Sequence, residues 1–268
     1  MPTPTPPSIS PTPNLPGPEF PENEVVGGLL ETSSQFKSFY QDVRGNITQT
    51  IRWVLDKDLK DTAYTRFVFD QEGRVIPLYI VLPRIPPNPE DDFIVAHELA
   101  AFLVVNEGYP LAYTLKPEPS LHNLCTMLND IFLTPLRDSM LERYGFDLER
   151  NYSSYTKLFY RQNVNFSCKP EIPGIFDSNT LSMAFAYAKY TIYWEQLLHE
   201  AGTRDIEFKS WYEEYCPSAL NDGEELFKMI QDIGWDKPND VKRFLDWVIW
   251  VKYQLNDYID IYTPNVAP

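Results

Sequence analysis

The sequence predicts an α+β fold, in which a small antiparallel sheet packs on helices and a mostly α-helical C-terminal region follows. β-branched and aromatic runs gather between residues 50 and 82, whereas apolar residues recur at helical spacing after about residue 150. Hydrophobic residues make up 43% of the 268 residues, which is enough for a packed core. Three regions follow: a proline-rich disordered tail at 1–24, an α+β domain at 25–150 and a tryptophan-rich helical region at 151–268 that packs on it.

The tail is predicted from its proline content. Nine prolines lie in the first 24 residues, which favours an extended, polyproline-like chain that does not pack. We expect a spacer there, and a ligand for a proline-binding module is the alternative. The segment has neither the basic nor the apolar part of a secretory signal.

The first elements of the domain change from helix to strand. Helical spacing of Phe36, Phe39 and Val43 predicts a helix at 31–44. Two or three antiparallel strands with a hairpin centred on Gly73 should follow. The predicted strands are Thr50–Leu55, Tyr64–Phe69 and Arg74–Leu82.

The clearest boundary in the sequence precedes a buried helix. Asn88 is suited to the N-cap and Pro89 to the first helical position, and three acidic residues follow at the positive end of the helix dipole. The helix should run to about Glu107, with Gly108 as its left-handed end. Further helices are predicted at Pro119–Leu133, Pro135–Tyr144, Ser178–Glu200, Asp205–Tyr215, Asp222–Ile233 and Asn239–Ile261.

Charge and cysteine content bear on partners and compartment. The chain has 23 basic and 38 acidic side chains, a net charge of −15, which excludes nucleic acid and an anionic membrane as partners. No apolar run is long enough to span a bilayer. Three widely spaced cysteines predict reduced, buried thiols, and the chain is expected to be cytoplasmic.

The only segment that suggests chemistry lies in the helix after Asn88. Eleven of the thirteen residues in FIVAHELAAFLVV are apolar, so this helix should be buried on most sides. His97 and Glu98 interrupt it where an unpaired polar group is costly. Either a metal ion or a hydrogen-bond network must therefore satisfy them.

Strands followed by a capped helix with Ala-His97-Glu98-Leu-Ala resemble the zincin metallopeptidases, and small gluzincin-like proteins most closely. The resemblance covers roughly residues 50–147. In that family an HExxH helix supplies two imidazoles to one zinc, and its glutamate activates the bound water. The resemblance implies that His97 is a metal ligand and Glu98 the general base.

The sequence departs from this family at Ala101, which stands where the second histidine belongs. The leading hypothesis is therefore a metallopeptidase-like protein with a degenerate zinc site and no cofactor, which binds a protein or peptide partner. The alternative is an active zinc-dependent peptidase whose ligands are His97, His122 and a carboxylate such as Asp130, with Glu98 as base.

A third hypothesis is a non-enzymatic structural or interaction module whose working part is the C-terminal helices. His97 and Glu98 are then a satisfied core pair, and their match to the zincin motif is a coincidence. His122 and Asn129 lie at the border of the apolar face of their helix, so both could point toward His97. Most tryptophans lie after residue 150, and core packing among helices is their expected role.

Overall fold

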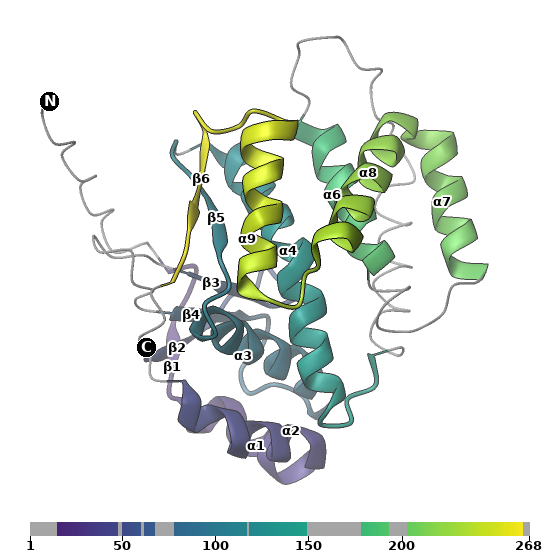
Figure 1. Ribbon diagram of the computed structural model, residues 1–268. Coiled ribbons are helices and arrows are strands. Elements are labelled where there is room, and N and C mark those ends of the chain that lie inside the picture. Colours follow the sequence, from purple (N-terminus) through teal and green to yellow (C-terminus); the bar gives the residue numbers. More distant parts are fainter. Residues whose placement is uncertain are drawn as a thin grey trace, which may run out of the picture. The chain divides into compact units, whose positions relative to one another are not determined.

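The computed structural model describes residues 15–47, 50–59, 62–67, 78–116, 118–148, 178–192 and 203–264. It confirms the α+β class, with helices, a four-stranded sheet and a two-stranded sheet (Figure 1). The chain divides into two compact units. Unit 1 comprises Met1–Glu107, Met140–Phe146 and Val266–Pro268, and unit 2 comprises Gly108–Ser139 and Asp147–Asn265. The first long stretch of unit 1 thus ends at Glu107.

Unit 1 combines helices with a mixed sheet in the strand order β1-β2-β4-β3. Its elements are β1 (Glu19–Phe20), α1 (Glu22–Thr32), α2 (Ser34–Val43), η1 (Arg44–Asn46), β2 (Ile51–Leu55), β3 (Tyr64–Arg66), β4 (Leu78–Leu82), η2 (Pro89–Asp91) and α3 (Asp92–Asn106).

The pairing of the central strands differs from the prediction. β3 and β4 are antiparallel as expected, whereas β2 and β4 run parallel, with Ile51 opposite Leu78. An antiparallel arrangement is therefore wrong for this pair. β4 is apolar at every position, and Tyr79–Leu82 are all buried, which is typical of a strand that is covered on both faces beside a parallel neighbour. The predicted hairpin turn at Gly73 lies outside the described residues.

The packed part of the chain begins earlier than residue 25, because part of the predicted tail joins the sheet. Phe20 pairs with Trp53 of β2, and the carbonyl of Pro18 accepts a hydrogen bond from the Leu55 N–H at 3.0 Å. Gly17 lies so close to the Leu55 carbonyl that a Cβ atom would overlap it. The missing side chain thus lets this segment pack against β2.

The helix predicted at 31–44 is α2, and a helix that was not predicted, α1, precedes it. α1 and α2 meet at Ser33, whose Oγ accepts a hydrogen bond from the Phe36 N–H at 3.1 Å and so caps α2. The same hydroxyl donates to Asp92 Oδ2 at 2.6 Å, at the start of α3. The two glycines of α1 weaken its helical propensity, which explains why the sequence pattern did not reveal it.

Glu22 joins the start of α1 to the end of α2. Its carboxylate accepts hydrogen bonds from the Tyr40 hydroxyl at 2.7 Å and from Arg44 Nε at 2.7 Å. Burial raises the pKa of Glu22, but the hydrogen bonds from Arg44 and Tyr40 and the charge of Arg44 outweigh burial and lower its pKa. Burial and the bond to Glu22 raise the pKa of Tyr40 to about 12.

The contacts of Glu22 with Tyr40 and Arg44 make the stability of the fold depend on pH in the acidic range. Because the pKa of Glu22 is lower in the folded than in the unfolded chain, its contribution is present above the unfolded pKa and is lost as pH falls through the folded pKa. We expect Glu22→Gln to lower the free energy of unfolding by about 1 kcal/mol at pH 7, with a smaller deficit below about pH 4. Urea unfolding at both pH values measures this. Glu24→Gln removes an exposed charge from the same turn, and an equal deficit there would contradict the role of Glu22.

Helix α3 begins and ends where the sequence predicts. The Asn88 N–H donates to Asp91 Oδ2 at 2.8 Å and the Asp91 N–H donates to the Asn88 carbonyl at 3.0 Å, which forms the turn η2 before α3. Gly108 has a φ of 87°, in the left-handed region that ends the helix. α3 contacts α2 and β3, and its side chains are buried on nearly all sides.

Unit 2 consists mainly of helices, with a two-stranded antiparallel sheet of β5 and β6 (Figure 1). None of the helices in the described residues has the length and apolar character required to cross a membrane. The elements are β5 (Leu111–Thr114), α4 (Pro119–Glu142), α6 (Ser178–Ile192), α7 (Thr203–Tyr215), α8 (Pro217–Ile233), α9 (Pro238–Asp246), η4 (Trp247–Lys252) and β6 (Ile259–Tyr262).

Several helix predictions in this unit are wrong in their extent, and α8 begins at Pro217 instead of Asp222. α4 continues through Pro135 instead of starting anew there. In the turn that contains the proline, Arg137 Nε donates to the Leu133 carbonyl at 3.0 Å. The helix predicted over Asn239–Ile261 ends early, because the alternation of Ile259–Tyr262 suits the strand β6.

Close approach of α6 and α8 depends on Gly223. A Cβ atom there would meet Tyr187 Cδ1 at 2.6 Å, and Tyr187 stacks on Phe208 and meets Tyr212 edge-on. We expect Gly223→Ala to lower the free energy of unfolding by about 1–2 kcal/mol, because the ring has no room to retreat. A Cβ atom at Gly28 in α1 would have nothing within 4 Å, so Gly28→Ala is the matched control and should stabilise by about 0.5–1 kcal/mol. Urea unfolding of both variants measures this, and a stabilised Gly223→Ala would contradict the close approach.

The cysteines differ from the prediction of reduced thiols. Cys125 is free and buried, as expected, whereas Cys216 is disulfide-bonded. The prediction is therefore wrong for Cys216, and the partner of this bond lies outside the described residues. Wide spacing in the sequence does not prevent a disulfide, because the fold and not the spacing brings two cysteines together.

Candidate functional site

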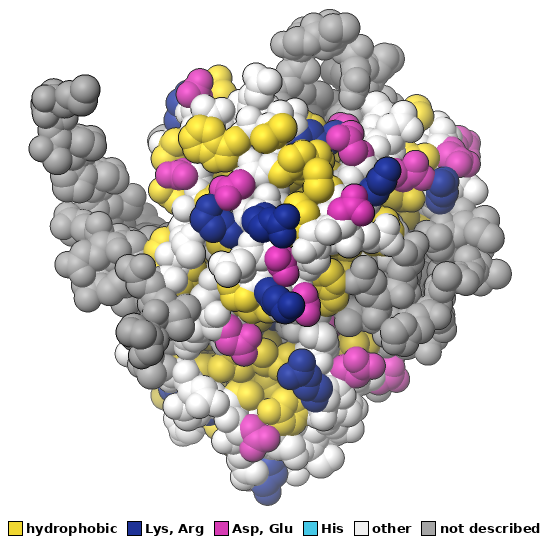
Figure 2. Space-filling view, in the orientation of Figure 1, with side chains coloured by type: hydrophobic (Ala, Val, Ile, Leu, Met, Phe, Trp, Pro, Cys, Tyr) yellow, Lys and Arg dark blue, Asp and Glu magenta, His cyan; other side chains and the backbone are white. Residues whose placement is uncertain are grey.

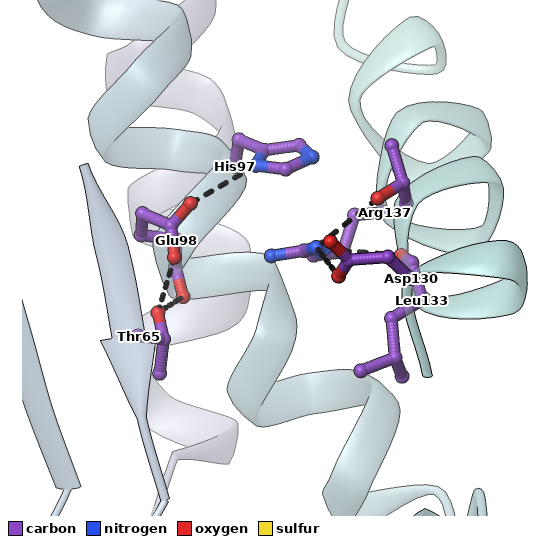
Figure 3. A network of polar contacts seen from close by, with 7 residues as sticks. Thr65, His97, Glu98, Asp130, Leu133 and Arg137 are labelled. Atoms are coloured by element: carbon purple, nitrogen blue, oxygen red, sulfur yellow. Dashed lines mark hydrogen bonds and ion pairs between the residues drawn. The ribbon is translucent and has the colours of Figure 1, made fainter. Parts of the chain in front are cut away.

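Glu98 is buried in unit 1 and bonds to a strand beside its helix. Its side chain is 7% exposed, and the Thr65 hydroxyl of β3 lies 2.5 Å from Oε2. The same hydroxyl lies 3.1 Å from the Glu98 carbonyl oxygen, so one threonine contacts both the side chain and the backbone (Figure 3). A hydrogen bond to a carboxylate in such a dry environment is stronger than one in water.

His97 lies on the other side of the same carboxylate. Its Nδ1 is 3.2 Å from Glu98 Oε1 (Figure 3). Its ring stacks on Phe93, with 5.7 Å between the ring centroids. The imidazole is 16% exposed on its side chain, so it is more accessible than Glu98. The two oxygens of Glu98 are therefore engaged by two different side chains, Thr65 and His97.

The described residues around His97 differ from the donor set of a catalytic zinc. Such a site takes three protein ligands and leaves a position open for water. Ala101, one turn after His97, is 1% exposed and has no donor atom. Among the described residues of the whole chain, no group of three His, Cys, Asp or Glu side chains is placed to hold a metal ion.

The other candidate ligands belong to unit 2, on α4. His122 is exposed, and its backbone carbonyl accepts a hydrogen bond from the Thr126 hydroxyl at 3.0 Å. Asp130 is one-third exposed and lies 3.6 Å from Arg137 Nη2 (Figure 3). Arg137 is itself buried, so Asp130 serves as a counter-ion to a buried guanidinium.

Asn129 has a structural contact that the helical wheel did not indicate. Its Oδ1 accepts a hydrogen bond from the Ala112 N–H at 2.7 Å, and its Nδ2 donates to the Ala112 carbonyl at 2.9 Å. The side-chain amide therefore pairs with β5 as a neighbouring strand would. The expectation that Asn129 could point toward His97 is replaced by this role.

Cys125 is not a candidate nucleophile, although it lies three residues after His122. Burial raises the pKa of its thiol to about 12, so the reactive thiolate is scarce at neutral pH. We expect the native chain to leave Cys125 unmodified by iodoacetamide at pH 8, and the chain unfolded in guanidinium to be alkylated there. Mass spectrometry of the peptide containing Cys125 measures both, and rapid alkylation of the native chain would contradict the burial.

Two features of the described residues escaped the sequence analysis. Thr65 is a polar residue in a predicted strand, and nothing in the sequence distinguishes it as the partner of Glu98. Trp250 is 54% exposed, although core packing was the expected role of the tryptophans after residue 150. Its neighbour Val251 is also exposed, so helical spacing alone predicts the wrong face here.

Comparison of the chain with protein-family models, with curated proteins and with solved structures found no match.

Proposed function

We propose that the chain is a metallopeptidase-like protein without peptidase activity, whose unit 1 binds an extended peptide segment of a partner protein. The observation that carries this proposal is the environment of Glu98, whose two oxygens contact Thr65 and His97. A general base must instead reach a water molecule that is activated by a metal.

Ala101 supports the same proposal. An imidazole at this position would complete the two-histidine pattern of the zincin helix, whereas alanine contributes only to the core. A buried Glu98 that bonds to Thr65 then has a structural role, because it joins α3 to β3. In this proposal the chain resembles zincins in the arrangement of helix and strand, and it uses no metal cofactor.

Peptide binding is proposed from the position of β3. In the described residues β3 ends the four-stranded sheet and pairs only with β4. Tyr64 and Arg66 are exposed on it, while Thr65 between them contacts Glu98. An edge strand presents unpaired backbone groups, to which an extended peptide can add as a further strand.

The compartment remains a prediction. A cytoplasmic chain is expected to keep its thiols reduced, whereas Cys216 is disulfide-bonded. The bond argues for an oxidising compartment. Counting free thiols by mass spectrometry, after alkylation of the chain in freshly lysed native cells, decides between the two: one free cysteine supports an oxidising compartment and three support the cytoplasm.

Metal content and peptidase activity test the proposal together. We expect the natively purified chain to hold no stoichiometric zinc, and wild type and Glu98→Gln to be equally inactive on a peptide library with added zinc. Stoichiometric, tightly bound zinc would overturn the degenerate site. Proteolysis that Glu98→Gln abolishes while the chain stays folded would establish the active peptidase instead.

Partner binding is tested separately on the sheet edge. Peptides selected from a displayed library on the full chain should protect the backbone amides of Tyr64–Arg66 from hydrogen exchange. The double variant Tyr64→Ala/Arg66→Ala should weaken binding, whereas Lys57→Ala, outside β3, should not. Protection that maps only to other segments would overturn β3 as the binding edge.

A further inference from the structure

An apolar surface lies at one end of unit 2, where β5 ends and β6 begins. Its residues are Leu115, Trp250, Val251 and Tyr258, which are 51%, 54%, 64% and 41% exposed. They are four of the five large hydrophobic side chains that are exposed among the described residues. Figure 2 shows hydrophobic side chains gathered near the upper end of α9 and of the β5–β6 pair. We call these four residues the Trp250 surface.

Backbone hydrogen bonds hold the segments of the Trp250 surface together. The Leu255 N–H donates to the Ile249 carbonyl at 2.6 Å, and the Tyr258 N–H donates to the Leu255 carbonyl at 2.8 Å. The Leu115 N–H donates in turn to the Tyr258 carbonyl at 2.7 Å. These bonds tie η4, the segment that leads into β6 and the residue that follows β5 to one another.

The local structure exposes apolar side chains while it buries a charged one. Lys252 Nζ lies 2.9 Å from Asp222 and 2.6 Å from Glu225, and its side chain is only 10% exposed. Trp250 and Val251, its neighbours in the π-helix η4, face outward. Folding alone favours burial of the apolar side chains and exposure of the lysine. π-Helical segments and large exposed apolar side chains are both frequent at interaction sites.

The ligand chemistry follows from the exposed rings and from the charge of the chain. Exposed Trp and Tyr rings are the surfaces on which polyproline segments bind. Residues 1–14 contain six prolines and no charged side chain, so a chain of net charge −15 does not repel them. A polyproline helix of this length spans roughly 43 Å, which is long enough to reach a neighbouring copy. We propose that the Trp250 surface binds the proline-rich residues 1–14 of a second copy of the chain.

Peptide titration tests this proposal on the full-length chain. The chain is made with alanine at its six N-terminal prolines, so that its own residues 1–14 do not compete with the added peptide. A fluorescein-labelled peptide of residues 1–14 should bind it saturably by fluorescence anisotropy. Trp250→Ala should weaken binding about tenfold or more, because aromatic side chains dominate such interfaces. The replaced prolines are Pro2, Pro4, Pro6, Pro7, Pro11 and Pro13.

The controls locate the site and the source of the ligand. Arg243→Ala changes an exposed residue of α9, the helix that leads into η4, and should leave the affinity within about twofold. Lack of saturable binding at about 1 mM peptide, or equal affinity in Trp250→Ala, would overturn the proposal. Sedimentation of the wild-type chain should show association that grows with concentration and that Trp250→Ala removes. A wild-type chain that stays monomeric throughout would overturn the second copy as the source.

Discussion

Replacement of Asn129 by leucine is expected to lower the free energy of unfolding by about 2–6 kcal/mol, the largest effect among the substitutions that we propose. Asn129 bonds both the N–H and the carbonyl of Ala112, and Ala112 is only 3% exposed. Leucine is similar in volume but can pair with neither group. Each buried backbone group left without a partner costs about 1–3 kcal/mol, and the two costs add.

Two further variants separate the loss of hydrogen bonds from the loss of packing. Asn129→Asp keeps the shape and one acceptor but loses the donor, and it presents an oxygen to the Ala112 carbonyl, so it should also destabilise by at least about 1 kcal/mol at pH 7. Asn123→Leu changes an exposed asparagine of the same helix and should stay within about 0.5 kcal/mol of wild type. Urea unfolding measures all three. An Asn129→Leu chain as stable as wild type would mean that β5 does not depend on this amide.

The sequence predicts the features of the fold that depend on residues close to one another along the chain. The start of α3 follows from Asn88 and Pro89, and its end from Gly108, because caps and left-handed glycines act within a few residues. The burial of α3 follows from its almost uninterrupted apolar residues. The requirement that Glu98 has a partner also follows, since a buried carboxylate is costly when it stands alone.

The sequence does not predict which residues meet across the fold. The partner of Glu98 is Thr65, 33 positions away on a strand whose alignment depends on its pairing with β4. The partner of Ala112 is an asparagine on the next helix, and a helical wheel shows only the border position of Asn129. The parallel pairing of β2 and β4 has the same cause, because strand order is decided by tertiary packing and not by the runs themselves.

Removal of the Thr65 hydroxyl is expected to destabilise unit 1 by about 2–3 kcal/mol, because a hydrogen bond to a charged, buried group is among the stronger ones. Thr65→Val keeps the shape of the side chain but takes the donor from Glu98 Oε2. Thr65→Ser keeps the hydroxyl and loses one methyl group, so it should cost about 1 kcal/mol. The difference between these two variants in urea unfolding measures the hydrogen bond.

A double-mutant cycle with Glu98→Gln shows whether the carboxylate itself is the partner. The glutamine side chain is neutral, so loss of the Thr65 hydroxyl should cost less beside it, and the coupling energy between the two positions should be about 1–2 kcal/mol. A coupling near zero would mean that Thr65 stabilises β3 without Glu98. A large coupling, in a chain that shows no peptidase activity with or without the substitutions, supports Glu98 as the residue that joins α3 to β3. A glutamate that activates a metal-bound water would not need the threonine for folding.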